Sequence, residues 1–373
     1  MTTATALEVK NYRESLPAET PVQYLDESGV RTTTEVRYPA PEMTRLVELH
    51  RKMVLGRRFD QQATSLTKQG RLAVYPSSRG QEACQIAAAM ALQPADWMFP
   101  TYRDSVALMT RGVEPVQILS MLAGDWHCGY DPKAHRCAPQ STPLATQLLH
   151  ATGLAYGELL RGRDTLALAL CGDGATSEGD FHEALNFAAV FGAPVIFLIQ
   201  NNGYAISVPL AQQSVAPSLA HKGVGYGMGS EHVDGNDPVA MLAVLDAAVA
   251  HVRAGRGPLV VEAYTYRLDA HTNADDATRY RQDSEVQGWL VRDPITRLTS
   301  YLQSQGRLND EASAALAIEA EDAAARLRAG MNADRPQDPL ELFRYVYAEQ
   351  TPQLREQEQQ AAAELAAETQ ADG

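Results

Sequence analysis

Short apolar segments alternate with helical segments through the middle of this chain, and this alternation restricts the fold more than any other feature. Residues 165–171 (TLALALC) and 194–200 (PVIFLIQ) are continuous apolar runs of strand length, and residues 178–191 between them have helical periodicity. A helix expected over about 238–254 leads to a third apolar strand, 258–266. Strands joined by helices of these lengths need crossover connections. The sequence therefore predicts an α/β fold with a parallel sheet covered by helices on both faces.

The segments on either side of this region differ from it in composition. Residues 1–40 are irregular and rich in Pro, Thr and Glu, so we expect an N-terminal arm. Residues 41–310 are expected to form one α/β domain that opens with a helix near its N-terminal end. Beyond that domain the chain is acidic, rich in Ala and helical in pattern, so residues 311–373 are predicted to be a helical C-terminal extension and tail.

The charge of the chain excludes some classes of partner. Lys and Arg number 32 against 46 Asp and Glu, which gives a formal net charge of -14. Nucleic acids and anionic membranes bind proteins mainly through cations that match phosphates, so we expect neither as a partner. No apolar run approaches the roughly 18 residues that span a bilayer. The N-terminal sequence also lacks an apolar signal core, and we expect a cytoplasmic protein.

The four cysteines are too few for a disulfide scaffold in a chain of this length. Cys128 and Cys137 lie beside His127 and His135 in the segment HCGYDPKAHRC. Mixed Cys and His side chains can bind zinc, but this spacing fits no usual pairing of zinc ligands. We favour a loop with incidental thiols, and a metal site there is the alternative.

Polar and small residues directly follow the first two apolar runs. The sequence GDGATSE follows the first run and NNGY follows the second. Ligands of open parallel sheets bind beyond the carboxyl ends of the strands, where Asp173 and Asn202 should emerge at one edge. A carboxylate and an amide oxygen suit magnesium, while Gly172, Gly174 and the start of the next helix suit a phosphate. These residues indicate a site for a metal-bound diphosphate, although a plain tight turn would explain GDG alone.

GDG and NN separated by one helix resemble the signature of thiamine diphosphate enzymes. More narrowly, GDGATSEGDFHEALNFAAVFGAPVIFLIQNNGYAIS resembles the alpha subunit of 2-oxo acid dehydrogenases, the decarboxylating components of the pyruvate and branched-chain multienzyme complexes. The similarity runs from about residue 40 to residue 310. It implies a thiamine diphosphate-binding fold and an oxidoreductase that passes the acyl group of a 2-oxo acid to a lipoyl-bearing acyltransferase.

The resemblance assigns roles to the positions that match the family's motifs. It implies that a carboxylate, an amide and a backbone carbonyl hold magnesium, and that small residues of the GDGA turn contact the diphosphate. The metal ligands would be Asp173, Asn202 and the carbonyl of Tyr204, and the residues at the cofactor would include Gly172, Gly174, Ala175 and Asn202.

Two further motifs match segments that lie along the cofactor in the family. In FPTYRDS, Tyr102 and Arg103 match a pair that reaches the diphosphate, to which arginine supplies bidentate donors. Without the resemblance, Arg103 would be read as one half of a surface ion pair with Asp104. In STPLATQ (141–147), Leu144 would help to impose a bent shape on the cofactor, and ordinary core is the alternative. Branched-chain members also bind potassium in this segment, which leaves a potassium site open here.

The segment TYRLDAHTNADDATRYR (265–281) resembles the family's active-site loop. His271 matches the histidine assigned as proton donor when the lipoyl group is acylated, at a position beside the cofactor. Imidazole titrates near neutral pH, so it can give and take protons. A lone loop histidine would otherwise be read as solvated. Thr272 stands at the position that is phosphorylated in animal enzymes, and Gln200 stands where animal branched-chain members have arginine.

One expected catalytic group is missing from this chain. The glutamate that activates thiamine diphosphate lies on the beta subunit in this family, and the chain is too short for a second cofactor domain of similar size. The resemblance therefore implies an active site formed between two kinds of chain. It implies two alpha and two beta subunits that dock to a lipoyl-bearing acyltransferase core.

The expected substrate depends on fewer residues. Residues 71–78 (RLAVYPSS) and Tyr102 should border the acyl pocket, and Val74 stands where some relatives have phenylalanine, which leaves room for a branched chain. One residue's volume changes such preferences by only about 1–3 kcal/mol. We expect oxidative decarboxylation of branched-chain 2-oxo acids of the 3-methyl-2-oxobutanoate type. The alternatives are the alpha subunits of pyruvate dehydrogenase (acetyl-transferring) or acetoin dehydrogenase and, from another class, a non-catalytic metal- or diphosphate-binding module.

Overall fold

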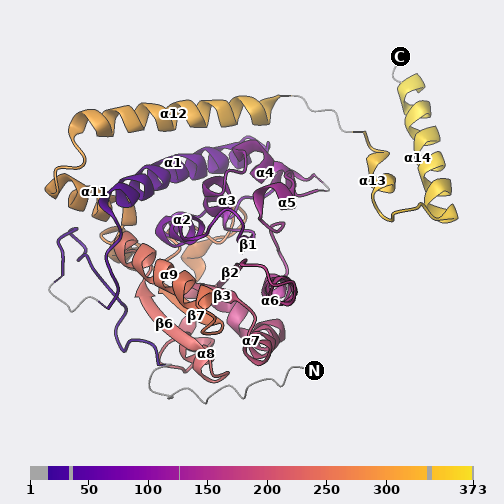
Figure 1. Cartoon of the computed structure of the whole chain (residues 1–373). Helices are drawn as coiled ribbons and strands as arrows, with labels where there is room; N and C mark the ends of the chain where they lie inside the picture. Colours follow the sequence, from indigo (N-terminus) through magenta and orange to yellow (C-terminus); the bar gives the residue numbers. More distant parts are fainter. Residues whose placement is uncertain (1–15, 33–36, 126, 334–337, 372–373) are drawn as a thin grey trace. The chain divides into compact units, whose positions relative to one another are not determined.

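The computed structural model describes residues 16–32, 37–125, 127–333 and 338–371 (Figure 1). The chain divides into two compact units, of which the first ends at Arg328 and the second begins at Ala329. The first part of the expected C-terminal extension therefore belongs to the first unit. Among the described residues, none of the helices combines the length and apolar character needed to cross a lipid bilayer.

Within the described ranges, five parallel strands form the sheet of the first unit, in the order β1-β2-β3-β7-β6. Gly172 pairs with Gln200, and Asn201 pairs with Tyr264, so the three central strands end at one edge. The predicted parallel α/β sheet is confirmed, and its three predicted strands are β2, β3 and β7. Strands β1 and β6 were not predicted. The strands are β1 (Trp97–Phe99), β2 (Ala167–Gly172), β3 (Val195–Asn201), β6 (Gly229–Asp234) and β7 (Leu259–Tyr264).

Helices cover both faces of this sheet (Figure 1). On one face, α6 (Thr146–Leu160) and α7 (Gly179–Phe191) pack on buried strand residues that include Phe197. On the other face, α9 (Pro238–Arg253) contacts β3, β6 and β7, and the Ala-rich α2 (Glu82–Ala91) packs against α9. Because α7 joins β2 to β3 and α9 joins β6 to β7, the chain winds on opposite faces in the two halves. Such a change of direction opens a crevice at the carboxyl ends of the central strands.

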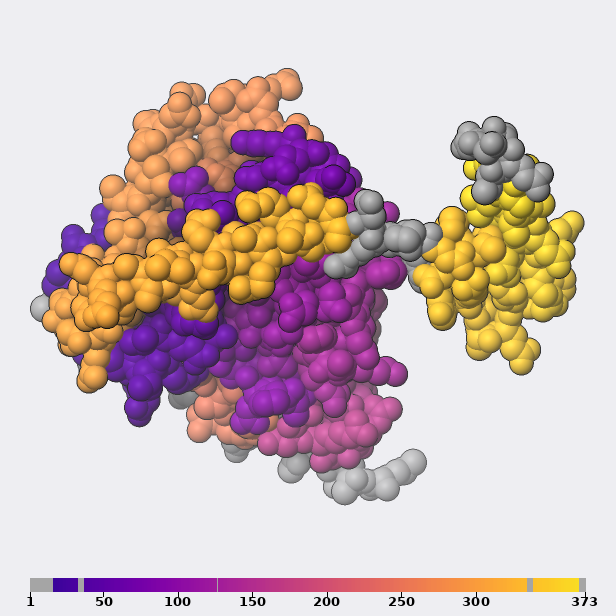
Figure 2. All heavy atoms as spheres, turned by 90° about the horizontal axis from the view of Figure 1, so that it is seen from above, coloured from indigo at the N-terminus to yellow at the C-terminus, as the bar shows by residue number. Residues whose placement is uncertain are grey.

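A further helical layer lies outside α2. Helix α1 (Met43–Lys68) packs on α2, and α12 (Asp310–Asn332) lies along α1, as Figure 2 shows. The ion pair between Arg51 and Glu319 joins these two helices, but exposed pairs of this kind contribute only about 0–1 kcal/mol. The buried side chain of Leu327 and two buried alanines are therefore the firmer attachment of α12.

The described part of the N-terminal arm lies against the edge of the sheet. Val22 forms a parallel bridge with Val233, so the arm extends the sheet past β6. The backbone N–H of Tyr24 donates to Oδ2 of Asp237 at 2.6 Å, and both residues are buried. The arm thus covers an edge strand that would otherwise present unpaired backbone groups.

The remaining elements connect these layers or follow them. In the first unit they are α3 (Ser105–Thr110), α4 (Pro115–Ala123), α5 (Pro132–His135), η2 (Asp173–Ser177), β4 (Tyr204–Ala205), β5 (Val208–Pro209), η3 (Leu210–Gln212), α8 (His221–Val224), η4 (Ala277–Arg279), α10 (Asp283–Leu290) and α11 (Pro294–Ser304). The second unit contains α13 (Glu341–Arg344) and α14 (Pro352–Ala371).

Candidate functional site

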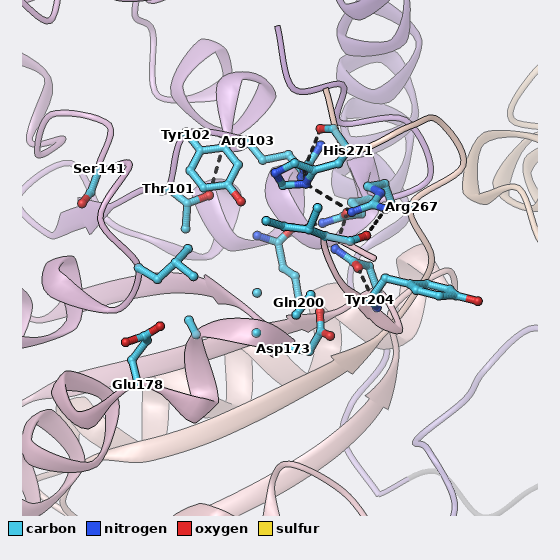
Figure 3. A pocket seen from close by; sticks show the side chains of 18 of the residues that line it. Thr101, Tyr102, Arg103, Ser141, Asp173, Glu178, Gln200, Tyr204, Arg267 and His271 are labelled. Carbon is cyan, nitrogen blue, oxygen red and sulfur yellow. Dashed lines mark hydrogen bonds between the residues drawn. The ribbon is translucent and has the colours of Figure 1, made fainter. Parts of the chain in front are cut away.

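A pocket lies at the carboxyl ends of β2, β3 and β7 (Figure 3). Residues from five separate motifs of the sequence line it, and they include every candidate site residue of the sequence analysis. Those residues are Tyr102, Arg103, Leu144, Gly172, Asp173, Gly174, Ala175, Asn202, Tyr204 and His271.

Oxygen atoms that suit a hard cation gather at the ends of β2 and β3. Burial raises the pKa of Asp173, while hydrogen bonds from Gln213 and from the backbone of Asn202 lower it. Oδ1 of Asn202 accepts the backbone N–H of Tyr204 at 3.2 Å and keeps a second lone pair. No three His, Cys, Asp or Glu side chains cluster as a metal centre among the described residues. A cation here would therefore depend on the carboxylate of Asp173 together with amide, carbonyl and ligand oxygens, which magnesium accepts.

The two glycines of the GDG turn have different steric surroundings. A Cβ added at Gly174 would lie 2.8 Å from Cβ of Ala205, which is too close for two methyl groups. A Cβ added at Gly172 would meet no neighbouring heavy atom within 4 Å. Because Gly172 also lines the pocket, it leaves open space for a ligand, whereas Gly174 allows β4 to approach the turn. Nζ of Lys222 donates to the carbonyl oxygen of Thr176 at 2.8 Å and holds the end of the turn.

Two guanidinium groups flank His271. Nη2 of Arg103 lies 3.0 Å from Nδ1 of His271, and Nη1 of Arg267 lies 3.3 Å from the same atom. Arginine only donates hydrogen bonds, so Nδ1 is the acceptor and the neutral imidazole carries its proton on Nε2. Burial, together with the charges of Arg103 and Arg267, lowers the pKa of His271 to about 4, against an opposing effect of Asp275. The imidazole is therefore neutral at pH 7.

The structure excludes the simpler alternatives for Arg103 and Leu144. Arg103 is buried, and its Nη1 donates to the carbonyl oxygen of Ser77 at 2.8 Å, so it is not a surface ion-pair partner of Asp104. Leu144 is 41% exposed and lines the pocket, so it is not a core residue.

Two residues with strained backbone lie at the pocket. Ala145, beside Leu144, has φ 65, and Ile206 has φ 57, values that cost a residue with a Cβ about 1–2 kcal/mol. The side chain of Ile206 is 54% exposed and lines the pocket, and its carbonyl oxygen accepts Nη2 of Arg267 at 2.8 Å. Strain of this kind gathers at sites where the backbone must hold a ligand in one geometry.

Several pocket residues were missed by sequence reasoning. Of these, Gln81 carried a weak signal, as a polar residue at the start of an Ala-rich helix. Oε1 of Gln147 is buried and accepts no hydrogen bond from any residue that the structure describes, although its Nε2 donates to the carbonyl oxygen of Leu170. The pocket residues to which the sequence analysis gave no individual role are Gln81, Thr101, Ser141, Pro143, Gln147, Glu178, Ala205 and Ile206.

Residues 71–78, which were expected to border an acyl pocket, form hydrogen bonds with residues 269–273 and do not line this pocket. None of residues 71–78 is among the described residues that line the pocket. The backbone N–H of Tyr75 donates to Oδ1 of Asn273 at 3.1 Å, and Oγ of Ser77 donates to Oδ2 of Asp269 at 2.7 Å. The proposed role of Val74 in substrate choice stays a prediction.

Comparisons with known proteins agree with this geometry. A family model described as "Dehydrogenase E1 component" matches residues 50–328. The chain is 46% identical over 348 residues to a 3-methyl-2-oxobutanoate dehydrogenase subunit alpha of Mycobacterium tuberculosis. The aligned residues cover 93% of this chain and 94% of that protein. It is 36% identical over 338 residues to a pyruvate dehydrogenase E1 component subunit alpha of Acholeplasma laidlawii, covering 89% and 96%. A protein of the same name from Staphylococcus aureus is 37% identical over 293 residues, covering 78% of each chain.

Proposed function

The chain belongs to the dehydrogenase E1 component family, and from this premise we propose that it is the alpha subunit of a branched-chain 2-oxo acid dehydrogenase. It is an oxidoreductase component of the 2-oxo acid dehydrogenase type. The proposed substrate is 3-methyl-2-oxobutanoate and related branched-chain 2-oxo acids. The observation that carries this choice is the higher identity to the relative named for 3-methyl-2-oxobutanoate than to those named for pyruvate.

The pocket fits the thiamine diphosphate on which this family depends. Gly172 leaves open space for a ligand, and Asp173 and Asn202 offer oxygens for its cation. The buried Oε1 of Gln147, which has no partner among the residues that the structure describes, offers an acceptor for a donor group. When bound, thiamine diphosphate supplies the carbanion and the electron sink that decarboxylation of a 2-oxo acid requires.

Each group of pocket residues has a proposed task in holding the cofactor. Asp173, Asn202 and the carbonyl of Tyr204 would hold magnesium, which accepts oxygen ligands and keeps sites for phosphate oxygens. Leu144, exposed in the pocket, would support the cofactor's rings. The residues proposed to contact the diphosphate are Tyr102, Arg103, Gly172, Gly174, Ala175 and Asn202.

The 141–147 segment offers a second candidate cation position. The carbonyl oxygen of Pro143 accepts the Oγ–H of Ser141 at 3.1 Å and keeps a second lone pair for a cation. Oxygen atoms of this kind suit a potassium ion, which we propose as a structural support for residues 141–147.

The proposed role of His271 is proton donation during acyl transfer. Arg103 and Arg267 hold Nδ1, so Nε2 is the nitrogen that presents a proton to the pocket. Negative charge placed beside Arg103, as a diphosphate would provide, raises the pKa of His271 toward the neutral range, because opposite charges favour the charged imidazolium. A ligand at the diphosphate position would thus prepare the histidine to give a proton.

The proposed partners follow from the family. A beta subunit completes the active site, and we propose an assembly of two alpha and two beta subunits. The acyl group is then passed to a lipoyl-bearing acyltransferase core.

Calorimetric titration of the alpha–beta complex with thiamine diphosphate, with and without magnesium, tests the proposed site. We expect binding that depends on magnesium and that Asp173→Asn abolishes. Asp180→Asn is the matched control, because Asp180 lies in the same segment but does not line the pocket. Binding that is independent of magnesium, or unchanged in Asp173→Asn, would contradict the proposed function.

A further inference from the structure

We propose that Asp104 is a positioning residue that fixes the orientation of the Asn202 side-chain amide through two intervening glutamines. This inference rests on the proposed function of Asn202 as a magnesium ligand. It assigns a task to three buried polar side chains, those of Asp104, Gln81 and Gln200, to which the proposed function gives none.

A continuous chain of side-chain hydrogen bonds joins Asp104 to Asn202. Nε2 of Gln200 donates to Oδ1 of Asp104 at 2.7 Å. Nε2 of Gln81 donates to Oε1 of Gln200 at 3.1 Å, and Nδ2 of Asn202 donates to Oε1 of Gln81 at 3.2 Å. All four residues are buried.

The carboxylate of Asp104 determines which way the donors and acceptors face along this series of hydrogen bonds. An ionised carboxylate only accepts hydrogen bonds, whereas each amide has one donating and one accepting end. Oδ2 of Asp104 already accepts the backbone N–H of Thr101 at 2.7 Å and its Oγ1–H at 2.9 Å, which leaves Oδ1 for Gln200. Gln200 must therefore turn its NH₂ toward Asp104 and its oxygen toward Gln81.

The same reasoning fixes the orientations of Gln81 and Asn202. Gln81 must donate to Gln200, so its oxygen faces Asn202. Asn202 must then donate its NH₂ to Gln81, and its Oδ1 is turned away from Gln81. Magnesium binds the oxygen of an amide and not its nitrogen, so only this orientation makes Asn202 a ligand.

Replacing the carboxylate by an amide would reverse the direction. In Asp104→Asn, the side-chain oxygen keeps the two donors of Thr101, and the NH₂ group then faces Gln200. Gln200 and Gln81 both turn over in response, and the NH₂ of Asn202 faces the metal position. Loss of a supporting hydrogen bond behind a metal ligand typically costs about 10- to 100-fold in metal affinity.

Manganese affinity of the alpha–beta complex, measured from the electron paramagnetic resonance signal of free Mn²⁺ at saturating thiamine diphosphate, tests this proposal. We expect Asp104→Asn to weaken Mn²⁺ binding by about 10-fold or more. Asp96→Asn is the matched control, because Asp96 is equally buried and its hydrogen-bond partners, Gln93, Leu166 and Arg253, do not line the pocket. It removes the same charge, and its Mn²⁺ affinity should stay close to that of the wild type.

A second substitution separates the direction of the chain from a simple loss of packing. In Asp104→Asn combined with Gln200→Glu, the new carboxylate accepts from both neighbours, so Gln81 and Asn202 return to their original orientations. We expect this double variant to recover the Mn²⁺ affinity that Asp104→Asn loses. Full affinity in Asp104→Asn, no recovery in the double variant, or an equal loss in folded Asp96→Asn would overturn the proposal. Absence of Mn²⁺ binding in the wild type would instead overturn the proposed function.

Discussion

Arg103 holds His271 by both its ring and its backbone: Nη2 lies 3.0 Å from Nδ1 and 3.1 Å from the carbonyl oxygen of the histidine. Arg103 comes from the segment after β1, whereas His271 comes from the loop after β7. This contact therefore joins two segments that line the pocket. It also couples the charge at the proposed diphosphate position to the protonation of the proposed proton donor.

The pKa of His271 should be about 4 in the chain without ligands, and Arg103→Gln should raise it. Burial is the largest cause of the lowered pKa, and the Arg103 charge is the next, so removing that charge favours the imidazolium. The Cε1–H proton resonance of His271, assigned with His271→Asn, reports the titration. An unchanged pKa in Arg103→Gln would contradict the coupling.

The lowered pKa of His271 also predicts how the free energy of unfolding changes with pH. The folded pKa lies below the ordinary value of 6.5, so the unfolded chain binds the proton first as the pH falls. The contribution of His271 to the free energy of unfolding is therefore complete above about pH 6.5 and declines as the pH falls toward 4. In His271→Asn this part of the pH dependence should disappear from denaturant unfolding curves.

Arg267→Met should loosen the active-site loop. The guanidinium of Arg267 is buried and donates to Ile206, Tyr280 and His271, so the substitution leaves three acceptors without this donor. Ile206 is exposed, Tyr280 and His271 are half-buried, and His271 keeps its bond from Arg103, so each lost hydrogen bond should cost about 0.5–1.5 kcal/mol. Limited proteolysis should cut residues 269–281 faster than in the wild type. The Arg279→Met variant, which changes an exposed arginine of the same loop, should be cut at the wild-type rate.

Alanine at the two glycines of the GDG turn should give opposite results. Gly174→Ala places a methyl group against Ala205 and should lower stability by about 1–3 kcal/mol, visible as a lower melting temperature. Gly172→Ala meets no protein atom, so the melting temperature without ligand should be unchanged. Its methyl group enters the pocket and should weaken thiamine diphosphate binding in calorimetry. Normal binding by Gly172→Ala would place the diphosphate elsewhere.

The central strands could be predicted because burial on both faces leaves a continuous apolar run. Strands β2, β3 and β7 have this pattern, and the sequence located each within a few residues. Strand β1 has only three residues, too few for a periodic signal. Strand β6 contains the buried Glu231, whose carboxylate is satisfied by Tyr38 and Arg37 from the distant N-terminal arm. Because charged residues are usually exposed, the local sequence around Glu231 does not indicate a buried strand.

The pocket could be predicted because its motifs follow strand ends, and strand order alone then brings them together. The hydrogen-bond chain through Gln81 and Gln200 could not be predicted. It depends on residues 81, 104, 200 and 202 meeting in space with matched donors and acceptors, and no spacing in the sequence encodes that. The hydrogen bond from the backbone N–H of Tyr75 to Asn273 could not be predicted for the same reason.

Oxo-acid-dependent dye reduction by the reconstituted alpha–beta complex tests the central claim most directly. With thiamine diphosphate and magnesium present, 3-methyl-2-oxobutanoate and pyruvate are compared by kcat/KM, and a complex carrying Asp173→Asn serves as the inactive control. We predict a clear preference for 3-methyl-2-oxobutanoate. A preference for pyruvate would contradict the proposed substrate, and no reduction with either acid would contradict the proposed enzyme.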